Sequence, residues 1–231
     1  MTPVPRLVIA IDGPAASGKS STAKWVADRL AIRHVDSGAL YRGLTAAVLA
    51  SGPAPETWTE AGVLGHTARV GLEPEGRSFV ACIDGEPAAD RIRSTDVTKH
   101  VSTVAAMPGV RAWVNAQVRA AADRHDVVVD GRDMGTAVFP DAPLKIFLVA
   151  DPWERARRRL IQRLQRFPTD EEVAEETDRL VQRDARDATQ TVAARDAVVV
   201  DTTYLTQEEQ VERIVALARA VTHRGDVTSG G

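Results

Sequence analysis

The stretch LVIAIDGPAASGKSST, residues 7–22, constrains the fold of this chain more than any other. It opens with Leu7–Ile11, a short apolar run rich in β-branched side chains, which is typical of a buried strand. Gly13–Ser20 then matches G-x-x-x-x-G-K-[ST], and apolar residues recur at helical spacing behind it. A plain glycine turn would explain Gly13 and Gly18, but not a lysine followed by a serine. The sequence therefore predicts a strand, a loop whose N–H groups face phosphate oxygens, and a helix whose N-terminus favours an anion.

Such a loop predicts binding of a nucleoside triphosphate. Lys19 is expected against the β- and γ-phosphates, and the Ser20 hydroxyl is expected to reach the Mg²⁺ ion that accompanies them. The residues expected to bind the triphosphate are Gly13, Pro14, Ala15, Ala16, Ser17, Gly18, Lys19, Ser20 and Ser21.

Charge and composition exclude several classes of protein. The 231 residues carry a net charge of −3, so the chain lacks the positive charge typical of nucleic-acid binding. Its apolar runs are too short to span a membrane, and the single Cys82 excludes an internal disulfide. We therefore expect a cytoplasmic monomer that binds neither nucleic acid nor membrane, with a disordered tail at 226–231.

Short apolar runs alternate with helical patterns along most of the chain. Besides the first strand, we expect buried strands at 32–35, 126–130, 144–150 and 197–201. This alternation predicts an α/β fold, a three-layer doubly wound parallel sheet. Residues 66–92 instead show short alternating segments separated by turns, which predict a small antiparallel sheet. That insertion is either structural or a mobile lobe over a substrate.

Charged residues follow two of these strands, where α/β proteins place ligand groups. After the second strand, Ser37 is well placed to cap a helix, and Arg42 brings a cation to the same place. Asp130 ends the strand at 126–130, and such a carboxylate often lies on the metal side in phosphate-loop proteins. Arg132 and Asp133 follow between glycines, which favours a functional site over a simple surface turn.

Two helical segments in the last third of the chain are rich in charge. Asp151 and Pro152 predict the start of the first, whose arginines form either a solvated face or a lid that brings cations onto phosphate. These are Arg155, Arg157, Arg158, Arg159, Arg163 and Arg166. In the acid-rich hairpin that follows, Arg183, Arg186 and Asp187 lie near one helical face, a spacing that ordinary salt bridges also explain.

Five blocks of the sequence resemble the bacterial cytidylate (CMP) kinases of the nucleoside monophosphate kinase family. They are GPAASGKSS, DSGALYR, DGRDMGTAVFPDA, LKIFL and RDARDAT, and the resemblance is collinear from about Ile9 to Leu217. DSGALYR and DGRDMGT are far more specific than the phosphate loop. The resemblance implies that ATP phosphorylates CMP or dCMP in the presence of Mg²⁺.

The resemblance also implies a division into parts. A phosphate-loop core would comprise 1–37, 106–152 and 190–225. A monophosphate-binding lobe with the small antiparallel sheet would comprise 38–105, and a helical lid 153–189.

The resemblance further assigns roles around the phosphates. Lys19 and Arg132 would be catalytic, and Arg42 and Arg132 would hold the α-phosphate of CMP with Ser37 nearby. Gln190 stands where the family commonly has an arginine. The phosphate contact of that arginine is therefore lost or falls to another lid arginine.

Around the nucleoside, the resemblance places Ser102, Arg111 and Asp133 against the cytosine ring. Arg183 and Asp187 would approach the sugar from the lid side. A carboxylate suits cytosine because the exocyclic amino group is a donor, whereas uracil has an oxygen there. An unmatched buried acceptor disfavours the wrong base by a few kcal/mol, in order of magnitude.

Two other classes of function share parts of this pattern. A kinase of another small acceptor, such as a different nucleotide or shikimate, would share the phosphate loop and the lid. It would have no need of the DGRDMGT block together with Ser102 and Arg111. A GTPase-like switch needs a base-reading N-K-x-D element, and the sequence contains none.

Overall fold

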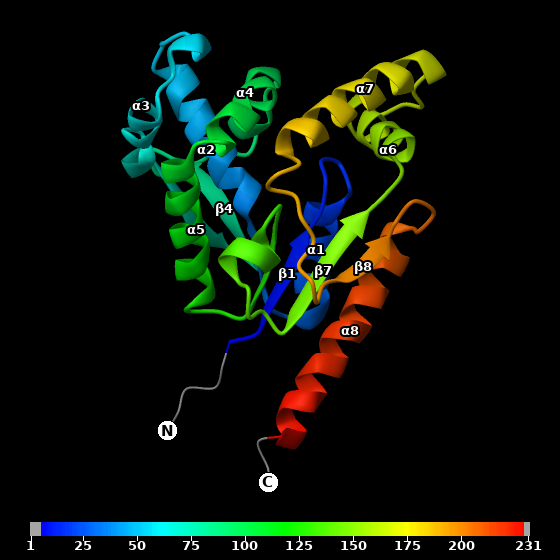
Figure 1. Ribbon diagram of the computed structural model, residues 1–231. Helices are drawn as coiled ribbons and strands as arrows, with labels where there is room; N and C mark the ends of the chain where they lie inside the picture. The colour runs from blue at the N-terminus through cyan, green and yellow to red at the C-terminus, as the bar shows by residue number, and fades with distance from the viewer. Residues whose placement is uncertain (1–5, 229–231) are drawn as a thin grey trace.

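The computed structural model describes residues 6–228, and its strands form one twisted sheet with helices on both faces (Figure 1). The strand order is β3-β4-β2-β6-β1-β7-β8, and β5 pairs with β4. From β4 to β8 neighbouring strands run parallel, whereas β3 and β5 run antiparallel to β4. The strands are β1 (Val8–Asp12), β2 (Arg33–Asp36), β3 (Val70–Glu75), β4 (Ser78–Ile83), β5 (Glu86–Pro87), β6 (Val127–Gly131), β7 (Leu144–Val149) and β8 (Val198–Asp201).

Helices complete the outer layers and extend above the sheet. They are α1 (Lys19–Leu30), α2 (Ser37–Ala50), α3 (Glu60–Leu64), α4 (Thr95–Ala105), α5 (Pro108–Ala122), α6 (Pro152–Leu164), α7 (Asp170–Asp187) and α8 (Gln207–Thr228). One apolar core lies between the sheet and α2, α4 and α5, and a second lies between the sheet and α1 and α8. The three-layer α/β fold is therefore confirmed.

The central strand β1 is buried on both faces of the sheet. Ile9 and Ile11 belong to the core beneath α1 and α8, whereas Ala10 belongs to the core beneath α2 and α5. A parallel strand covered on both faces needs apolar side chains at every position, so its sequence reads as a continuous apolar run.

One feature of the insertion goes beyond the sequence prediction. The antiparallel pair of β3 and β4 forms as expected, with Val70 opposite Ile83. It is not a separate sheet, however, because β4 also pairs parallel to β2 through His34 and Val35. The insertion therefore extends the central sheet at one edge.

One predicted helix start is confirmed, and another is corrected. Asp151 caps α6 as predicted; Ser94 caps α4, and Thr206 and Glu209 form a capping box at the start of α8. Ser37, however, does not cap α2: the Oδ1 of Asp36 accepts from the backbone N–H of Ala39 at 3.2 Å and takes that role. A carboxylate at this position reaches the free N–H groups of the first turn, which leaves the Ser37 hydroxyl for another partner.

The structure tests only part of the predicted disordered tail at 226–231. α8 continues to Thr228, so residues 226–228, assigned to the tail, are helical. Residues 229–231 and 1–5 lie outside the described residues. Within 6–228, no helix has both the length and the apolar character needed to cross a membrane.

Candidate active site

The phosphate loop joins β1 to α1 and begins at a position that admits no side chain. Gly13 has φ of +155°, and a Cβ built on it would lie 2.4 Å from the carbonyl oxygen of Leu148 on β7. Lys19 begins α1, and its Nζ donates to the carbonyl oxygen of Pro14 at 2.9 Å. The loop therefore wraps around the lysine side chain, at the carboxyl end of the sheet.

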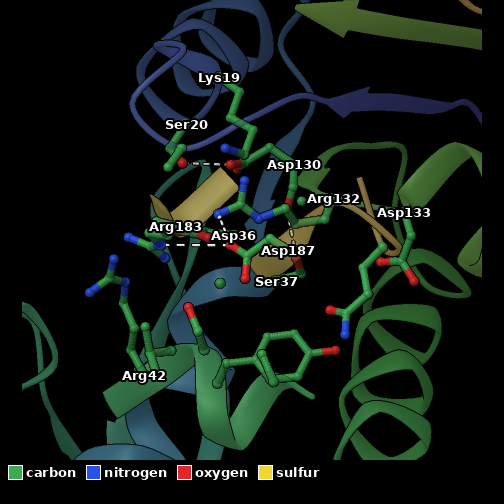
Figure 2. Close-up of a pocket in the computed structure, with 18 of the residues that line it drawn as sticks. Lys19, Ser20, Asp36, Ser37, Arg42, Asp130, Arg132, Asp133, Arg183 and Asp187 are labelled. Carbon is green, nitrogen blue, oxygen red and sulfur yellow. Dashed lines mark hydrogen bonds and ion pairs between the residues drawn. The ribbon is translucent and has the colours of Figure 1, made fainter. Parts of the chain in front are cut away.

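A pocket of about 200 Å³ opens beside this loop (Figure 2). Its walls come from the loop, the start of α2, the facing parts of α4 and α5, the turn after β6, and α7. Every residue predicted to bind the acceptor lines it: Ser37, Arg42, Ser102, Arg111, Arg132, Asp133, Arg183 and Asp187. Their roles toward a ligand remain predictions, but the structure brings together side chains from four separate parts of the sequence.

The triphosphate residues divide into two groups. Ala15, Ala16, Lys19 and Ser20 line the pocket. Within the described part of the chain, the other members of the set are not in this lining: Gly13, Pro14, Ser17, Gly18 and Ser21. The Ser21 hydroxyl donates to the carbonyl oxygen of Gly18 at 2.9 Å, and this contact stabilises the first turn of α1.

A carboxylate at the end of β6 lies next to the loop serine. The Ser20 Oγ donates to the Oδ2 of Asp130 at 2.5 Å, and the ring Nε2 of His34 lies 2.7 Å from the Oδ1. Burial opposes the charged form of His34, but the hydrogen bond and charge of Asp130 outweigh it and raise the pKa of the ring. Asp36 pairs in register with Asp130, and burial together with that neighbouring charge raises its pKa.

The centre of the pocket holds more positive than negative charge. The Nη2 of Arg132 lies 2.7 Å from the Oδ2 of Asp187, and the Nε of Arg183 lies 3.7 Å from the same oxygen. Burial, together with the charges of Arg132 and Arg42, lowers the pKa of Arg183 to about 10. Burial and the charge of Arg132 lower the pKa of Lys19 to about 7. Such mutual repulsion among cations is relieved when an anion binds between them.

Arg42 borders the pocket from α2. Its Nη1 donates to the Thr98 hydroxyl at 3.2 Å and to the carbonyl oxygen of Ile92 at 3.5 Å. Since both acceptors are neutral, they leave the positive charge of Arg42 available to a ligand. Burial lowers the pKa of this guanidinium as well.

The arginines of α6 have different environments, and the lid role remains a prediction. Arg155 is buried and donates to the carbonyl oxygen of Ala15 and to Asp184 on α7, each at 2.7 Å. Arg158 donates to backbone carbonyls in the turn after β8. Arg159 lines the pocket, although its Nε lies 3.0 Å from a carboxylate oxygen of Glu176. The others pair with glutamates of α6 or α7: Arg157, Arg163 and Arg166.

The far end of the pocket contains Arg111 and Asp133, which we call the base-end pair because the resemblance predicts the cytosine base beside them. Arg111 on α5 bonds to the Oδ2 of Asp133, and its Nη1 donates to the Oε1 of Gln190 at 2.6 Å. Tyr41 also lines this pocket; its hydroxyl is buried without a hydrogen-bond partner in residues 6–228, and burial raises its pKa to about 12. Ser102 contributes from α4.

Sequence reasoning did not select some of the residues that the structure places here. Asp36 and Tyr41 belong to the DSGALYR block, and their position at the end of a strand is a signal that would have found them. Arg159 was one of six arginines with no local feature to distinguish it. The acid-rich segment expected to be a hairpin forms the single helix α7. Its Arg183 and Asp187 line the pocket, whereas Arg186 bonds to the backbone of its own helix.

Comparison with known proteins identifies the family of this chain. A family model described as cytidylate kinase matches residues 9–220. The cytidylate kinase of Limosilactobacillus fermentum is 43% identical over 211 residues, covering 89% of this chain and 92% of its own. That of Salinibacter ruber is 42% identical over 230 residues, covering 95% and 100%. The crystal structure of an uncharacterized protein from Eubacterium ventriosum shares the fold alone, with a TM-score of 0.50, 13% identity, and coverage of 93% and 99%. With its family model matched across nearly its whole length, this chain belongs to the cytidylate kinase family.

Proposed function

We propose that this protein transfers the γ-phosphoryl group of ATP to CMP and dCMP, giving ADP and CDP or dCDP. One observation carries the proposal: a single pocket has a phosphate loop at one end, the base-end pair at the other, and between them two arginines that share one carboxylate. That arrangement suits two phosphorylated molecules placed end to end.

The chemistry requires positioning and charge neutralisation more than proton transfer. An oxygen of the CMP phosphate forms a bond to the γ-phosphorus as the bond from that phosphorus to the β-bridging oxygen breaks. The attacking oxygen is ionised at neutral pH, so no side chain is needed as a general base. Lys19 would neutralise charge on the ATP side, while Arg132 would do so around the transferring group.

The residues beside the loop suit Mg²⁺. It prefers hard oxygen ligands and is commonly held by one or two protein groups together with substrate phosphates. Ser20 and Asp130 supply a hydroxyl and a carboxylate at that position. In residues 6–228 no cluster of three or more His, Cys, Asp or Glu side chains forms a metal cage, which agrees with a metal that arrives with ATP. When bound, Mg²⁺ neutralises phosphate charge that would oppose transfer.

At the acceptor end, we assign Arg42, Arg132 and Ser37 to the CMP phosphate. The Ser37 hydroxyl donates to the carbonyl oxygen of Asp130 at 2.8 Å, so it ties the start of α2 to the end of β6. Asp133 would accept from the cytosine amino group. One of its oxygens already accepts from Arg111, and a carboxylate has acceptor capacity to spare.

At the nucleoside, we assign Ser102 and Arg111 to the base, and Arg183 and Asp187 to the sugar. These last two lie on α7, whose hairpin with α6 stands beyond the carboxyl end of β7 (Figure 1). The hairpin and the loop share a small apolar cluster that includes Ala15 and Leu160. We propose that segment 153–189 acts as a lid that excludes water from the transferring group.

We propose the same division of the rest of the chain. Segment 38–105 would bind the monophosphate, and segments 1–37, 106–152 and 190–225 would form the core. Cys82 is a free buried thiol, which agrees with a reducing cytoplasm. We propose a monomeric enzyme that needs no nucleic acid or membrane partner.

A panel of acceptors in a coupled ADP-release assay tests the proposal. With ATP and Mg²⁺, CMP and dCMP should be phosphorylated much faster than UMP, AMP, GMP or shikimate. Preference for another acceptor would refute the assignment of the base end. Slow ATP hydrolysis that no acceptor accelerates would indicate a nucleotide-dependent switch instead.

A further inference from the structure

A buried histidine outside the pocket lining holds the carboxylate that faces the phosphate loop. His34 lies in β2 with 7% of its surface exposed, and its Nε2 is 2.7 Å from the Oδ1 of Asp130. Among the described residues that line the pocket, His34 does not appear. The ring therefore contacts the site only through this carboxylate.

Asp130 itself is held at both oxygens. It is 1% exposed, and while the histidine contacts Oδ1, the Ser20 hydroxyl donates to Oδ2 at 2.5 Å. An ionised carboxylate only accepts hydrogen bonds, so the Nε2 of His34 is the donor in this contact. With one donor at each oxygen, the rotation of the carboxylate plane is restrained.

An apolar side chain would suit the buried position of His34 better unless the ring had a specific partner. Its neighbour in the strand, Val35, is fully buried and apolar, as expected beneath α2. A buried polar group without a hydrogen bond is costly, and so is a buried carboxylate that has lost a donor. The contact thus restrains both the His34 ring and the Asp130 carboxylate. That carboxylate is also the one that accepts from the loop residue Ser20.

We propose that His34 is a positioning residue that orients the Asp130 carboxylate toward the Mg²⁺ of bound ATP. The inference rests on the proposed function, because it takes Asp130 and Ser20 as the protein groups on the metal side. Outer groups that orient a ligand to a metal typically change metal affinity by about 10- to 100-fold when they are removed.

Two amide variants test this role with nearly matched side chains. The amide nitrogen of glutamine reaches about as far as Nε2, whereas that of asparagine reaches only about as far as Nδ1. In His34→Asn, the Mg²⁺ concentration that half-saturates the stimulation of ATP binding should rise about 10- to 100-fold. In His34→Gln it should stay within about threefold of the wild type. Calorimetric titrations with ATP in EDTA should give affinities within about twofold for all three proteins.

A spectroscopic measurement on the wild-type protein does not depend on how the variants fold. The Nε2–H resonance of His34 should shift when Mg²⁺ is added to the ATP complex, because its hydrogen-bond acceptor then faces the metal. An unshifted resonance would overturn the proposal. So would wild-type Mg²⁺ dependence in folded His34→Asn, or an equal loss in His34→Gln and His34→Asn.

Asp130→Asn separates this inference from the proposed function. If that variant keeps wild-type Mg²⁺ dependence, Asp130 is not on the metal side and the role of His34 falls, whatever the acceptor panel shows. If the Mg²⁺ titrations behave as stated but the panel shows no CMP phosphorylation, the positioning role stands and the choice of acceptor is refuted.

Discussion

Replacing Asp133 by asparagine tests the base end directly. The side chain of Asp133 is 9% exposed and that of Arg111 is 19% exposed, so their charges are only weakly screened by solvent. A hydrogen bond to a charged group contributes about 1.5–3 kcal/mol. Since about 1.4 kcal/mol corresponds to a tenfold change, kcat/KM for CMP should fall by roughly 10- to 150-fold. The KM for ATP should change by less than about twofold, because ATP binds at the opposite end of the pocket.

The same variant should also weaken the choice between bases. An asparagine amide can present either its oxygen or its NH2 group, so it can pair with cytosine or, after rotation, with uracil. The preference for CMP over UMP should therefore narrow by about tenfold or more, by the same reasoning.

Steady-state kinetics with CMP and UMP at saturating ATP, together with ATP titrations, measure both effects. Thermal unfolding controls for loss of structure, since the neutral variant leaves Arg111 without its counter-charge. Two results would refute the reasoning: an unchanged ratio of CMP to UMP turnover, or equal losses in ATP and CMP affinity.

Three further perturbations test other parts of the site. Burial and neighbouring charge lower the pKa of Lys19 to about 7, and bound phosphates raise it again. At pH 8 the lysine is therefore mostly neutral before ATP binds and charged afterwards, so ATP binding should take up close to one proton. Calorimetry in buffers of different ionisation enthalpy measures this uptake. Lys19→Arg stays charged and should abolish that uptake; equal uptake in both proteins would contradict the assignment. Gln190→Ala removes an acceptor from the base-end pair, so KM for CMP should rise about 3- to 10-fold, in line with a loss near 1 kcal/mol. Its kcat should stay within about twofold, Gln190→Glu should keep the low KM, and a fall in kcat alone would indicate a phosphate contact instead. Gly131→Ala would place a Cβ 2.6 Å from the Ser37 Oγ. Because such overpacking costs about 1–3 kcal/mol, the melting temperature of the variant should fall by several degrees. Gly71→Ala, with nothing within 4 Å of its Cβ, is the matched control, and equal losses in both would contradict steric crowding.

Local sequence predicted the elements of the fold because the physical causes of those elements are themselves local. Apolar runs identified β1, β2, β6, β7 and β8 to within about a residue or two, and Asp151 with Pro152 identified a helix start. The loop from Gly13 to Ser20 needs only consecutive residues, so its motif is complete in one segment. Arg132 and Asp133 were found because ligand groups follow parallel strands in this class of fold.

Other contacts join residues far apart in the chain, and no periodicity specifies them. Gln190 meets Arg111 across 79 positions, and Ser20 meets Asp130 across 110. His34 gave no signal in a short strand, since its role depends on which side chain the neighbouring strand β6 presents to it.

The sequence by itself therefore determined the phosphate loop, the parallel α/β framework and, through its blocks, the resemblance to cytidylate kinases. Only the tertiary structure decided which charges neutralise one another and which remain available, such as the single Asp187 carboxylate beside two guanidiniums. The physical reason is range: strands, turns and caps depend on neighbouring residues, whereas charge balance depends on every group within several ångströms, whatever its position in the chain.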